Sequence, residues 1–468
     1  MFPPFSEKKA EMILQELIQA LYEGSASLEQ TARVSEERKN QGIMLGVLVC
    51  LDKSGKEVNL VTNSGNAKKL KLEKKKLKVI DSIVSAEEIE NALSGNDRRI
   101  HEITEKIQEI KSHTTNDDSH TDSELAILNR KLKELCGQSL EKVHALYNFH
   151  CIDGKVRTLR EICAKYNHGK LPPTGTGDCC APKLLDYAFS HDLQPISLAE
   201  CPYKDEKGRA EQSPVSNNYT LCIPNISLLP PCDERCGILL PAMLGLRILY
   251  RDEAICVVNK ESGILSVPGR TEDKKDCVES RFKRLFGEKV EIAQPAVHRL
   301  DMETSGVMIL AFTKEAHREM NRQFEAKEVQ KEYIALLDGV LAKKGIPQTG
   351  SMELFFRLDV DNRPHQIWDA ENGKSAVTEW KILGVERYRA PDGSARPATR
   401  VLFKPRTGRT HQLRLVSADS HGFGIPIIGD TLYGKCEAGE RLLLHAQKVS
   451  FSHPVTGEKM TIECEAEF

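Results

Sequence analysis

The chain has 468 residues, enough for two or three domains with cores of their own, and its 40% hydrophobic and 29% charged residues are typical of a globular protein. A formal net charge of −2 excludes a protein that binds nucleic acid through overall positive charge, so any such binding must come from a local patch. We find no signal peptide and no apolar run long enough to span a bilayer, and the fourteen cysteines are scattered. These features predict a cytoplasmic protein with reduced thiols and no membrane contact.

The first segment, residues 1–67, is predicted to contain one helix and one β-hairpin. Apolar residues between Met12 and Leu21 recur at the spacing of an amphipathic helix that begins after Ser6. Residues 43–60 alternate between apolar and polar side chains around a turn at Lys53–Lys56, which is the pattern of a hairpin.

Residues 68–148 are predicted to form a helical coiled-coil hairpin. Two stripes with a three-four-three spacing lie on either side of a polar segment at residues 112–123, and their members are Ile100, Ile103, Ile107 and Ile110, then Leu125, Leu128, Leu132 and Leu135. A lysine-rich run, Lys68–Lys78, precedes them. The simpler interpretation is that the stripes bury against each other and the lysines are solvated. The alternative is an arm that touches RNA or the ribosome through these lysines.

Residues 149–245 are predicted to form a cysteine-rich helical domain with proline-rich connectors. Its cysteines are Cys151, Cys163, Cys179, Cys180, Cys201, Cys222, Cys232 and Cys236. Buried free thiols are the favoured interpretation, because cysteine is a common small core residue. A tetrahedral structural zinc site is the alternative, with Cys232 and Cys236 as two ligands and Cys179, Cys180, Cys201 and His191 as candidates for the others.

From residue 246 onward the pattern is rich in β-strands, and we place a domain boundary near residue 245. Four segments are predicted to be strands: Ile255–Val258, Val307–Phe312, Tyr333–Leu337 and Val401–Lys404. The fold class is therefore α+β, with a mixed, mainly antiparallel sheet in the C-terminal domain, residues 246–468, and a largely helical N-terminal extension.

Three polar segments of the C-terminal half carry candidate functional residues. His298–Gly306 precedes a strand, Arg406–Arg414 holds three arginines and a histidine, and Lys331-Glu-Tyr333 begins another strand. Each has a simpler interpretation when taken alone: a turn stabilised by Asp301, a solvated basic loop and a core tyrosine. A cationic loop also suits phosphates, and a guanidinium suits a carboxylate.

Taken together, these segments resemble the RluA-type pseudouridine synthases, which modify ribosomal and transfer RNA. His298–Gly306 matches the family signature H-R-L-D-x-x-T-S-G. The other family motifs occur in the family's order, as Asn259–Gly269, Lys331–Ala335, Gly408–Arg414, Ile428–Gly434 and Leu443–Ala446. The resemblance covers roughly residues 246–468.

The resemblance implies isomerisation of a uridine in structured RNA, with Asp301 as the catalytic carboxylate, Arg414 as its guanidinium partner and Tyr333 stacked on the uracil. The residues expected to hold the RNA are His298, Arg299, Lys404, Arg406, Arg409, His411 and Gln412. The reaction changes no oxidation state and transfers no group, so we expect no cofactor and no catalytic metal. The sequence also lacks a GxGxxG fingerprint and a P-loop in this half.

Two other functions fit parts of this pattern. A catalytically silent RNA-binding or ribosome-assembly module would not require Asp301, Tyr333 and Arg414 together. An aspartate-nucleophile glycosidase uses related chemistry at C1′ but pairs two carboxylates across the bond, and the first motif offers only Glu303 as the second.

Some segments are similar to one subgroup of this family, and others differ from the family pattern. Ser266–Arg270 and Asn362–Pro364 are similar to the subgroup that acts on tRNA anticodon stem-loops and a similar ribosomal hairpin. Val416 stands where relatives commonly have a histidine, and no basic module of the S4 type is found near the N-terminus. Gly175–Leu185 and Pro231–Cys236 resemble parts of an N-terminal extension found on some bacterial relatives.

Overall fold

The computed structural model describes residues 5–30, 43–65, 68–72, 77–113, 119–167, 169–204 and 226–468. The chain divides into two compact units, Met1–Gly245 and Leu246–Phe468, which we call the N-terminal and C-terminal units. Among the described residues, no helix has both the length and the apolar character of a membrane span.

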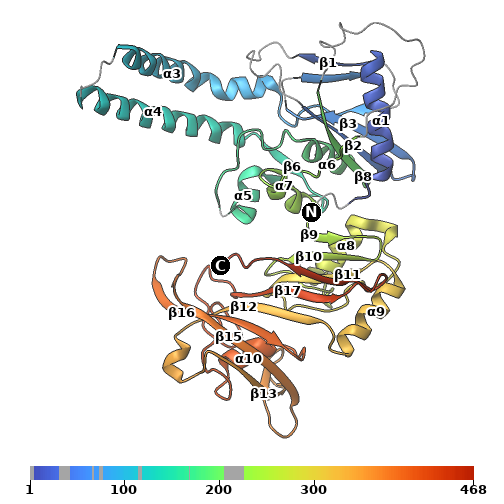
Figure 1. Ribbon diagram of the computed structural model, residues 1–468, viewed down its shortest axis with the longest axis vertical. Helices are drawn as coiled ribbons and strands as arrows, with labels where there is room; N and C mark the ends of the chain where they lie inside the picture. Colours follow the sequence, from blue (N-terminus) through green and yellow to red (C-terminus); the bar gives the residue numbers. More distant parts are fainter. Residues whose placement is uncertain are drawn as a thin grey trace. The chain divides into compact units, whose positions relative to one another are not determined.

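A four-stranded sheet with the order β5-β3-β2-β8 forms the centre of the N-terminal unit (Figure 1). Its strands are β2 (Ile43–Leu51), β3 (Glu57–Asn63), β5 (Lys78–Val79) and β8 (Gln194–Tyr203). The pairing of β2 with β3 confirms the predicted hairpin, and the Asp52 carboxylate closes its turn by accepting from the backbone N–H of Ser54 at 2.8 Å. The predicted N-terminal helix is α1 (Lys8–Glu23), whose apolar face joins the core of this sheet.

Strand β8 corrects the prediction that residues 149–245 are helical. It pairs antiparallel with β2 from Ile43↔Tyr203 to Leu51↔Gln194. β8 contains Pro195 and Pro202, but it is an edge strand, where a missing N–H on the open side costs no ladder hydrogen bond. The N-terminal unit is therefore a mixed α and β structure, and the helical prediction is wrong for this segment.

Helices α3 (Ala86–His113) and α4 (Ser119–His144) lie side by side, as Figure 1 shows. Ile103, Ile107 and Leu135 are buried between them, and other members of the two predicted stripes pack against these three. The amide of Asn96 donates to the buried hydroxyl of Ser139 at 3.1 Å, which adds one polar tie between the helices. The stripes do pack against each other, while a coiled-coil supercoil remains a prediction. Residues 114–118 of the polar segment lie outside the described residues.

The lysine-rich run is partly a strand, β4 (Lys68–Leu72), which pairs antiparallel with β1 (Ala26–Gln30). Lys69 forms an ion pair with Asp81 at 3.0 Å, and Lys71 forms one with Glu29 at 2.5 Å. These two lysines are therefore engaged within the unit, which favours the simpler interpretation for them. Residues 73–76 of the run lie outside the described residues.

The remaining elements of the N-terminal unit are short, and one helix packs directly on the sheet. They are β6 (Asn148–His150), β7 (Val156–Thr158), α5 (Leu159–Tyr166), α6 (Cys180–Ser190) and α7 (Cys236–Leu244). Helix α6 packs on β2, where Gly46 leaves room for Cys180, since a Cβ at position 46 would lie 2.4 Å from the Cys180 Cβ.

The C-terminal unit is built on a ten-stranded sheet with the order β14-β13-β15-β16-β12-β17-β11-β10-β9, and β18 pairs with β17. The strands are β9 (Arg247–Arg251), β10 (Ile255–Lys260), β11 (Ser305–Ala311), β12 (Gln330–Leu337), β13 (Thr349–Leu358), β14 (Gln366–Trp368), β15 (Lys374–Arg389), β16 (Ala395–Pro405), β17 (Leu444–Ser452) and β18 (Lys459–Glu463). All pairs are antiparallel except β11 with β17, which confirms the predicted mixed, mainly antiparallel sheet. The four predicted strands are confirmed as parts of β10, β11, β12 and β16.

Short helices flank this sheet: α8 (Val278–Phe286), α9 (Lys314–Glu325), α10 (Gln412–Ala418) and the 3-10 turns η1 (Glu272–Lys274), η2 (Gly287–Lys289) and η3 (Leu341–Lys344). One apolar cluster forms around β10, β11 and α9, and a second forms around β12, β15, β16 and α10. Every residue of β11 is buried, so the loop that precedes this strand is anchored to the interior of the unit.

Candidate active site

A pocket of about 480 Å³ opens between the loop before β11, strand β12 and the segment before α10. Nine of the ten predicted site residues line it: Asp301, Tyr333, Arg414, His298, Arg299, Arg406, Arg409, His411 and Gln412. Lys404 does not. Segments separated by up to a hundred residues thus meet at one concave surface.

Strand β17 aligns the end of the Asp301 loop with Tyr333, because it pairs with the strands on both sides. Ala446 of β17 pairs with Gly306 of β11 on one side and with Tyr333 of β12 on the other. Neighbouring strands are about 4.8 Å apart, so Tyr333 begins roughly two strand spacings from the end of the Asp301 loop. Gly306 has a φ of +117°, and a Cβ there would lie 2.3 Å from the Ala446 carbonyl oxygen, so only glycine permits this approach.

The backbone on both sides of Asp301 is held by residues of the segment Asn259–Gly269. The hydroxyl of Ser266 donates to the Leu300 carbonyl at 2.7 Å and accepts from the Leu300 N–H at 3.0 Å. The ammonium of Lys260 donates to the Met302 carbonyl at 2.9 Å and to two further carbonyls, of Glu261 and Ile264. Lys260 is 1% exposed, and its burial lowers its pKa to about 7 while the charge of Asp301 acts in the opposite direction. Sequence motifs included both residues without indicating this role.

Replacing Lys260 with methionine is expected to lower kcat by about 10- to 100-fold and to leave RNA affinity within about twofold of wild type. The three carbonyls lose their donor, and a carboxylate displaced by even 1 Å loses much of its reactivity. Single-turnover rates and binding constants, measured separately, check this expectation. The matched control is Lys381→Met, an exposed lysine of β15. An unchanged kcat in Lys260→Met would show that this tie does not position Asp301.

Arg414 pairs with Asp430 rather than with Asp301, which corrects the predicted partner. Its Nε and Nη2 atoms donate to the two Asp430 carboxylate oxygens at 2.9 and 2.5 Å, and Nη2 also lies 2.9 Å from the Glu303 carboxylate. The Arg414 side chain is 2% exposed and the Asp430 side chain 0%. Asp301 acts on Arg414 only through its charge. A motif fixes the order of residues along the chain but not which carboxylate the guanidinium reaches, so the sequence could not distinguish the two.

The Asp301 carboxylate accepts no hydrogen bond from any residue that the structure describes. It is partly exposed in the pocket, and its charge acts on the groups around it. Burial raises the pKa of the Tyr333 phenol, and the charge of Asp301 raises it further. Burial lowers the pKa of His411, against the effect of Asp301. At neutral pH the pocket therefore combines an available carboxylate with a protonated phenol and an uncharged imidazole.

His411 is oriented by Tyr433, a residue that the sequence did not single out. The Tyr433 hydroxyl accepts from the backbone N–H of Gln366 at 2.8 Å and lies 2.7 Å from Nδ1 of His411. The Tyr433 hydroxyl can then donate its own proton to Nδ1 of His411. Nδ1 is therefore the acceptor, and the proton of the neutral imidazole is on Nε2. His411 can donate a hydrogen bond from this nitrogen to a bound molecule.

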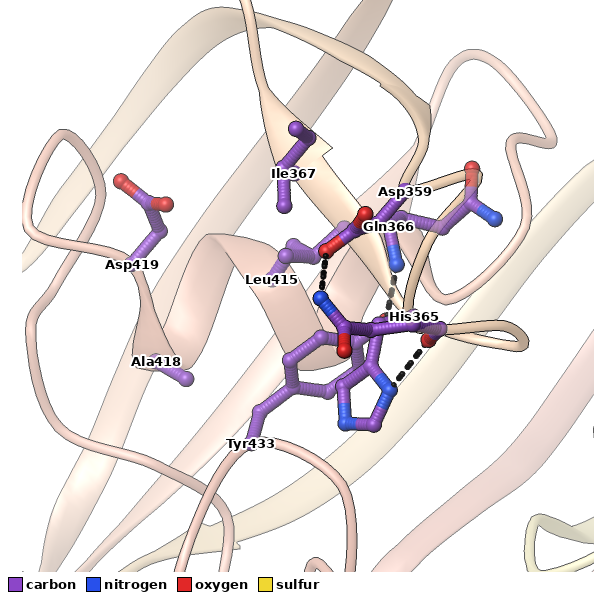
Figure 2. A pocket seen from close by; sticks show the side chains of 9 residues that line it. Asp359, His365, Gln366, Ile367, Leu415, Ala418, Asp419 and Tyr433 are labelled. Carbon is purple, nitrogen blue, oxygen red and sulfur yellow. Dashed lines mark hydrogen bonds between the residues drawn. The ribbon is translucent and has the colours of Figure 1, made fainter.

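Tyr433 also lines a second pocket of about 480 Å³, which Figure 2 shows beside the helix α10. His365, Gln366 and Asp419 are among its other lining residues. In the loop that follows α10, where the sequence departs from its relatives, His421 stacks on Trp368 with ring centroids 3.6 Å apart. Trp368 follows Ile367, which lines the second pocket.

Two of the predicted RNA-binding cations are paired with acids of neighbouring strands. Lys404 lies 2.7 Å from Glu332, and the guanidinium of Arg406 donates to both oxygens of Glu379, at 2.8 and 3.0 Å. The positive charge available to bind RNA is therefore smaller than the number of lysines and arginines in this segment suggests. Within the described part of the pocket, Arg299 and Arg409 have no acidic partner.

Two further predicted RNA-binding residues have structural contacts through their side chains. Gln412 is 4% exposed; its oxygen accepts from Thr407 and Arg409, and its nitrogen donates to Val377 and Thr378. His298 accepts the N–H of Ile309 at its Nε2 atom, at 3.1 Å, and burial lowers its pKa to about 3. Both side chains support the walls of the pocket, and His298 is an uncharged residue here.

Comparison with known proteins gives consistent matches for this unit. The family model described as RNA pseudouridylate synthase matches residues 254–419. The chain is 45% identical over 224 residues to the dual-specificity RNA pseudouridine synthase RluA of Yersinia pestis, covering 47% of this chain and 99% of that protein. It is 43% identical over 226 residues to RluA of Escherichia coli strain K12, covering 48% and 94%. A solved structure, human RNA pseudouridylate synthase domain containing 1, matches 47% of this chain and 83% of that chain at 28% identity, with a TM-score of 0.38.

Proposed function

Because the chain belongs to the RluA-type RNA pseudouridine synthases, which isomerise uridine to pseudouridine in RNA, we propose that Asp301 is the catalytic carboxylate of this reaction. The observation that carries the proposal is the Asp301 carboxylate itself. It lines a pocket of suitable size for a small ligand, on a loop held from both sides, and accepts no hydrogen bond from the described residues.

The reaction breaks the bond from ribose C1′ to uracil N1, joins C1′ to C5 and then releases the C5 proton. Asp301 either attacks C1′ or removes a ribose proton, and both routes need the ionised carboxylate. The charges of Asp301 and the nearby Arg414 attract each other within the site. The raised pKa of Tyr333 keeps its phenol protonated, which favours stacking on the uracil over acting as the base for the C5 proton.

A uridine stacked in an RNA helix cannot reach Asp301, so the base must leave the stack and enter the pocket. Unstacking costs on the order of a few kcal/mol and is least costly in a loop. We therefore propose a tRNA or ribosomal RNA stem-loop as the substrate. The segment Ser266–Arg270 supports this proposal, because its first residue holds the Asp301 loop and the segment resembles the subgroup acting on such loops. A cytoplasmic location follows from such a substrate.

The glycosidase alternative loses its second carboxylate in this geometry. Glu303 is bound to the Arg414 guanidinium at 2.9 Å and accepts from the Thr431 hydroxyl at 2.6 Å. Both carboxylate oxygens of Glu303 are engaged by these side chains, so Glu303 is not free to act as the second carboxylate across the bond.

The test incubates the full chain with tRNA and ribosomal hairpin transcripts that carry tritium at uridine C5. Tritium release, pseudouridine in the digested RNA and no free uracil are expected together. Free uracil would identify a glycosidase, and RNA binding without either product would identify a binding module. Mapping pseudouridines in a deletion strain against wild type then identifies the uridine.

RNA affinity is expected to fall with salt, with a slope set mainly by the unpaired cations of the pocket. Each phosphate contact contributes about −0.7 to the log–log slope for single-stranded RNA. Arg299→Ala should therefore make the slope shallower by about 0.7, whereas Lys404→Ala, whose lysine is paired with Glu332, should leave it unchanged. Binding titrations across a fourfold salt range measure both. Equal slopes for wild type and Arg299→Ala would remove Arg299 from the RNA contact.

A further inference from the structure

Three cysteines of the N-terminal unit converge although they are distant in sequence. The sulfur atoms of Cys179, Cys232 and Cys236 all lie within 4.8 Å of one another. Cys179 is the N-cap of α6, and Cys236 is the first residue of α7. Cys232 lies in the turn before α7, where its carbonyl accepts from the Gly237 N–H at 3.0 Å. The cluster therefore joins the starts of two helices.

The other residues proposed as ligands from the sequence are not part of this cluster. Cys180 points toward β2, where its thiol donates to the Met44 carbonyl at 3.4 Å, and Cys201 is 1% exposed in the sheet core. His191 follows the C-terminal end of α6, a helix of eleven residues, and stacks on Tyr187. An α-helix rises about 1.5 Å per residue, so His191 lies roughly 18 Å along the axis from Cys179. These three residues are excluded as ligands together with Cys179.

Two of the three cysteines reach solvent. Cys232 is exposed and Cys179 is partly exposed, whereas a cysteine that only fills core space is buried. The backbone N–H groups of Arg235 and Cys236 and the side chains of Cys179 and Cys236 lie close around the Cys232 sulfur. Two helix N-termini also favour negative charge here. Lys183, which is 2% exposed, supplies a buried cation whose charge acts on Cys179.

The spacing of the sulfur atoms fits one small tetrahedral ion. Zinc–thiolate bonds of about 2.3 Å place the sulfur atoms of a tetrahedral site roughly 3.8 Å apart. The three sulfurs already lie within 4.8 Å, so rotation about the side-chain bonds is sufficient to bring them to that distance. Calcium and magnesium prefer oxygen ligands, which the cluster does not offer.

We propose that Cys179, Cys232 and Cys236 bind one zinc ion as thiolates and that this ion fastens the start of α6 to the start of α7. Binding releases the thiol protons to solvent and involves no change of oxidation state. The site is structural, and Asp301 belongs to the other unit, so the chemistry of uridine isomerisation does not pass through it. A zinc-dependent fold in this unit accounts for the three cysteines, which the catalytic reaction does not use.

Elemental analysis of the full chain, purified without chelator, is the first test. About one zinc per chain is expected, and a chelator should lower the melting temperature of the wild-type protein. Cobalt substituted for zinc should give the charge-transfer absorption of thiolate ligands, which reports the sulfur atoms directly. The cobalt spectrum needs no variant, so the proposal stays testable if a cysteine variant fails to fold.

Cysteine variants then assign the ligands. Cys179→Ser and Cys232→Ser should each lose most of the metal and the response to chelator. Cys136→Ser and Cys436→Ser, which change exposed cysteines outside the cluster, should keep both. Less than about a tenth of an equivalent of zinc, with a melting temperature indifferent to chelator, would overturn the proposal. A disulfide between two of the three cysteines, found by mass spectrometry of the purified protein, would also overturn it.

Discussion

Asp301→Asn is expected to reduce pseudouridine formation to below a few per cent of wild type, with fold and RNA affinity preserved. The amide has almost the same volume as the carboxylate but can neither attack C1′ nor accept a proton, so the loss is at least about 100-fold. The Asp301 side chain forms no ion pair in the described structure, so its charge holds no element in place. Tritium release, a binding titration and thermal melting measure the three properties.

The matched control is Asp361→Asn, an exposed aspartate of the same unit that lies outside the active-site pocket. It should keep full activity. Asp301→Asn that retains more than a few per cent of wild-type turnover would contradict the catalytic assignment. A loss of RNA affinity equal to the loss of rate would instead make Asp301 a binding residue.

The catalytic loop and its sheet could be predicted because their patterns are local. The apolar run Val307–Phe312 predicted a buried strand, and the polar segment before it predicted a loop at the strand's end. Tyr333 and Asp301 lie at one pocket because β17 pairs with β12, which carries Tyr333, and with β11, which follows the Asp301 loop. The order of the motifs along the chain predicted that both residues are part of one site, but it could not predict the distance between them.

The electrostatics of the site could not be predicted in the same way, because they depend on the register of distant strands. Glu332 and Lys404 meet because β12 pairs with β16 through Tyr333↔Phe403, and Glu379 lies opposite Lys404 on the other side. Cross-strand neighbours of opposite charge stabilise the sheet and reduce the charge that is left for RNA. The number of basic residues in one segment therefore overestimates the positive charge that is available to bind RNA.

The N-terminal unit shows the same limit for secondary structure. Pro195 and Pro202 disfavour a strand on local grounds, yet their segment becomes β8 because β2 offers an open edge next to it. The grouping of Cys179 with Cys232 and Cys236 likewise depends on how α6 and α7 pack. Of these three cysteines, only the short spacing between Cys232 and Cys236 could be recognised in the sequence.

Arg414→Ala is expected to destabilise the C-terminal unit by roughly 3–5 kcal/mol, because it leaves the buried Asp430 carboxylate without its guanidinium. For a unit of this size, this corresponds to a fall in melting temperature of about 10 °C. Turnover should fall as well, since the positive charge that faces the Asp301 carboxylate in the site is removed. Thermal melting and tritium release measure the two effects.

The double variant Arg414→Met with Asp430→Asn separates stability from catalysis. It removes both buried charges, and the asparagine oxygen can still accept from the N–H groups of Leu432 and Tyr433, which now bond to Asp430 at 2.9 and 3.0 Å. Most of the lost stability should return, because position 430 no longer holds an unpaired buried charge and the Glu303 side chain, 21% exposed, can be solvated. Activity should remain low, because Asp301 still lacks its neighbouring cation. Recovery of both properties would mean that Arg414 acts on the reaction only by holding the fold, and an unchanged melting temperature in Arg414→Ala would contradict the buried pair itself.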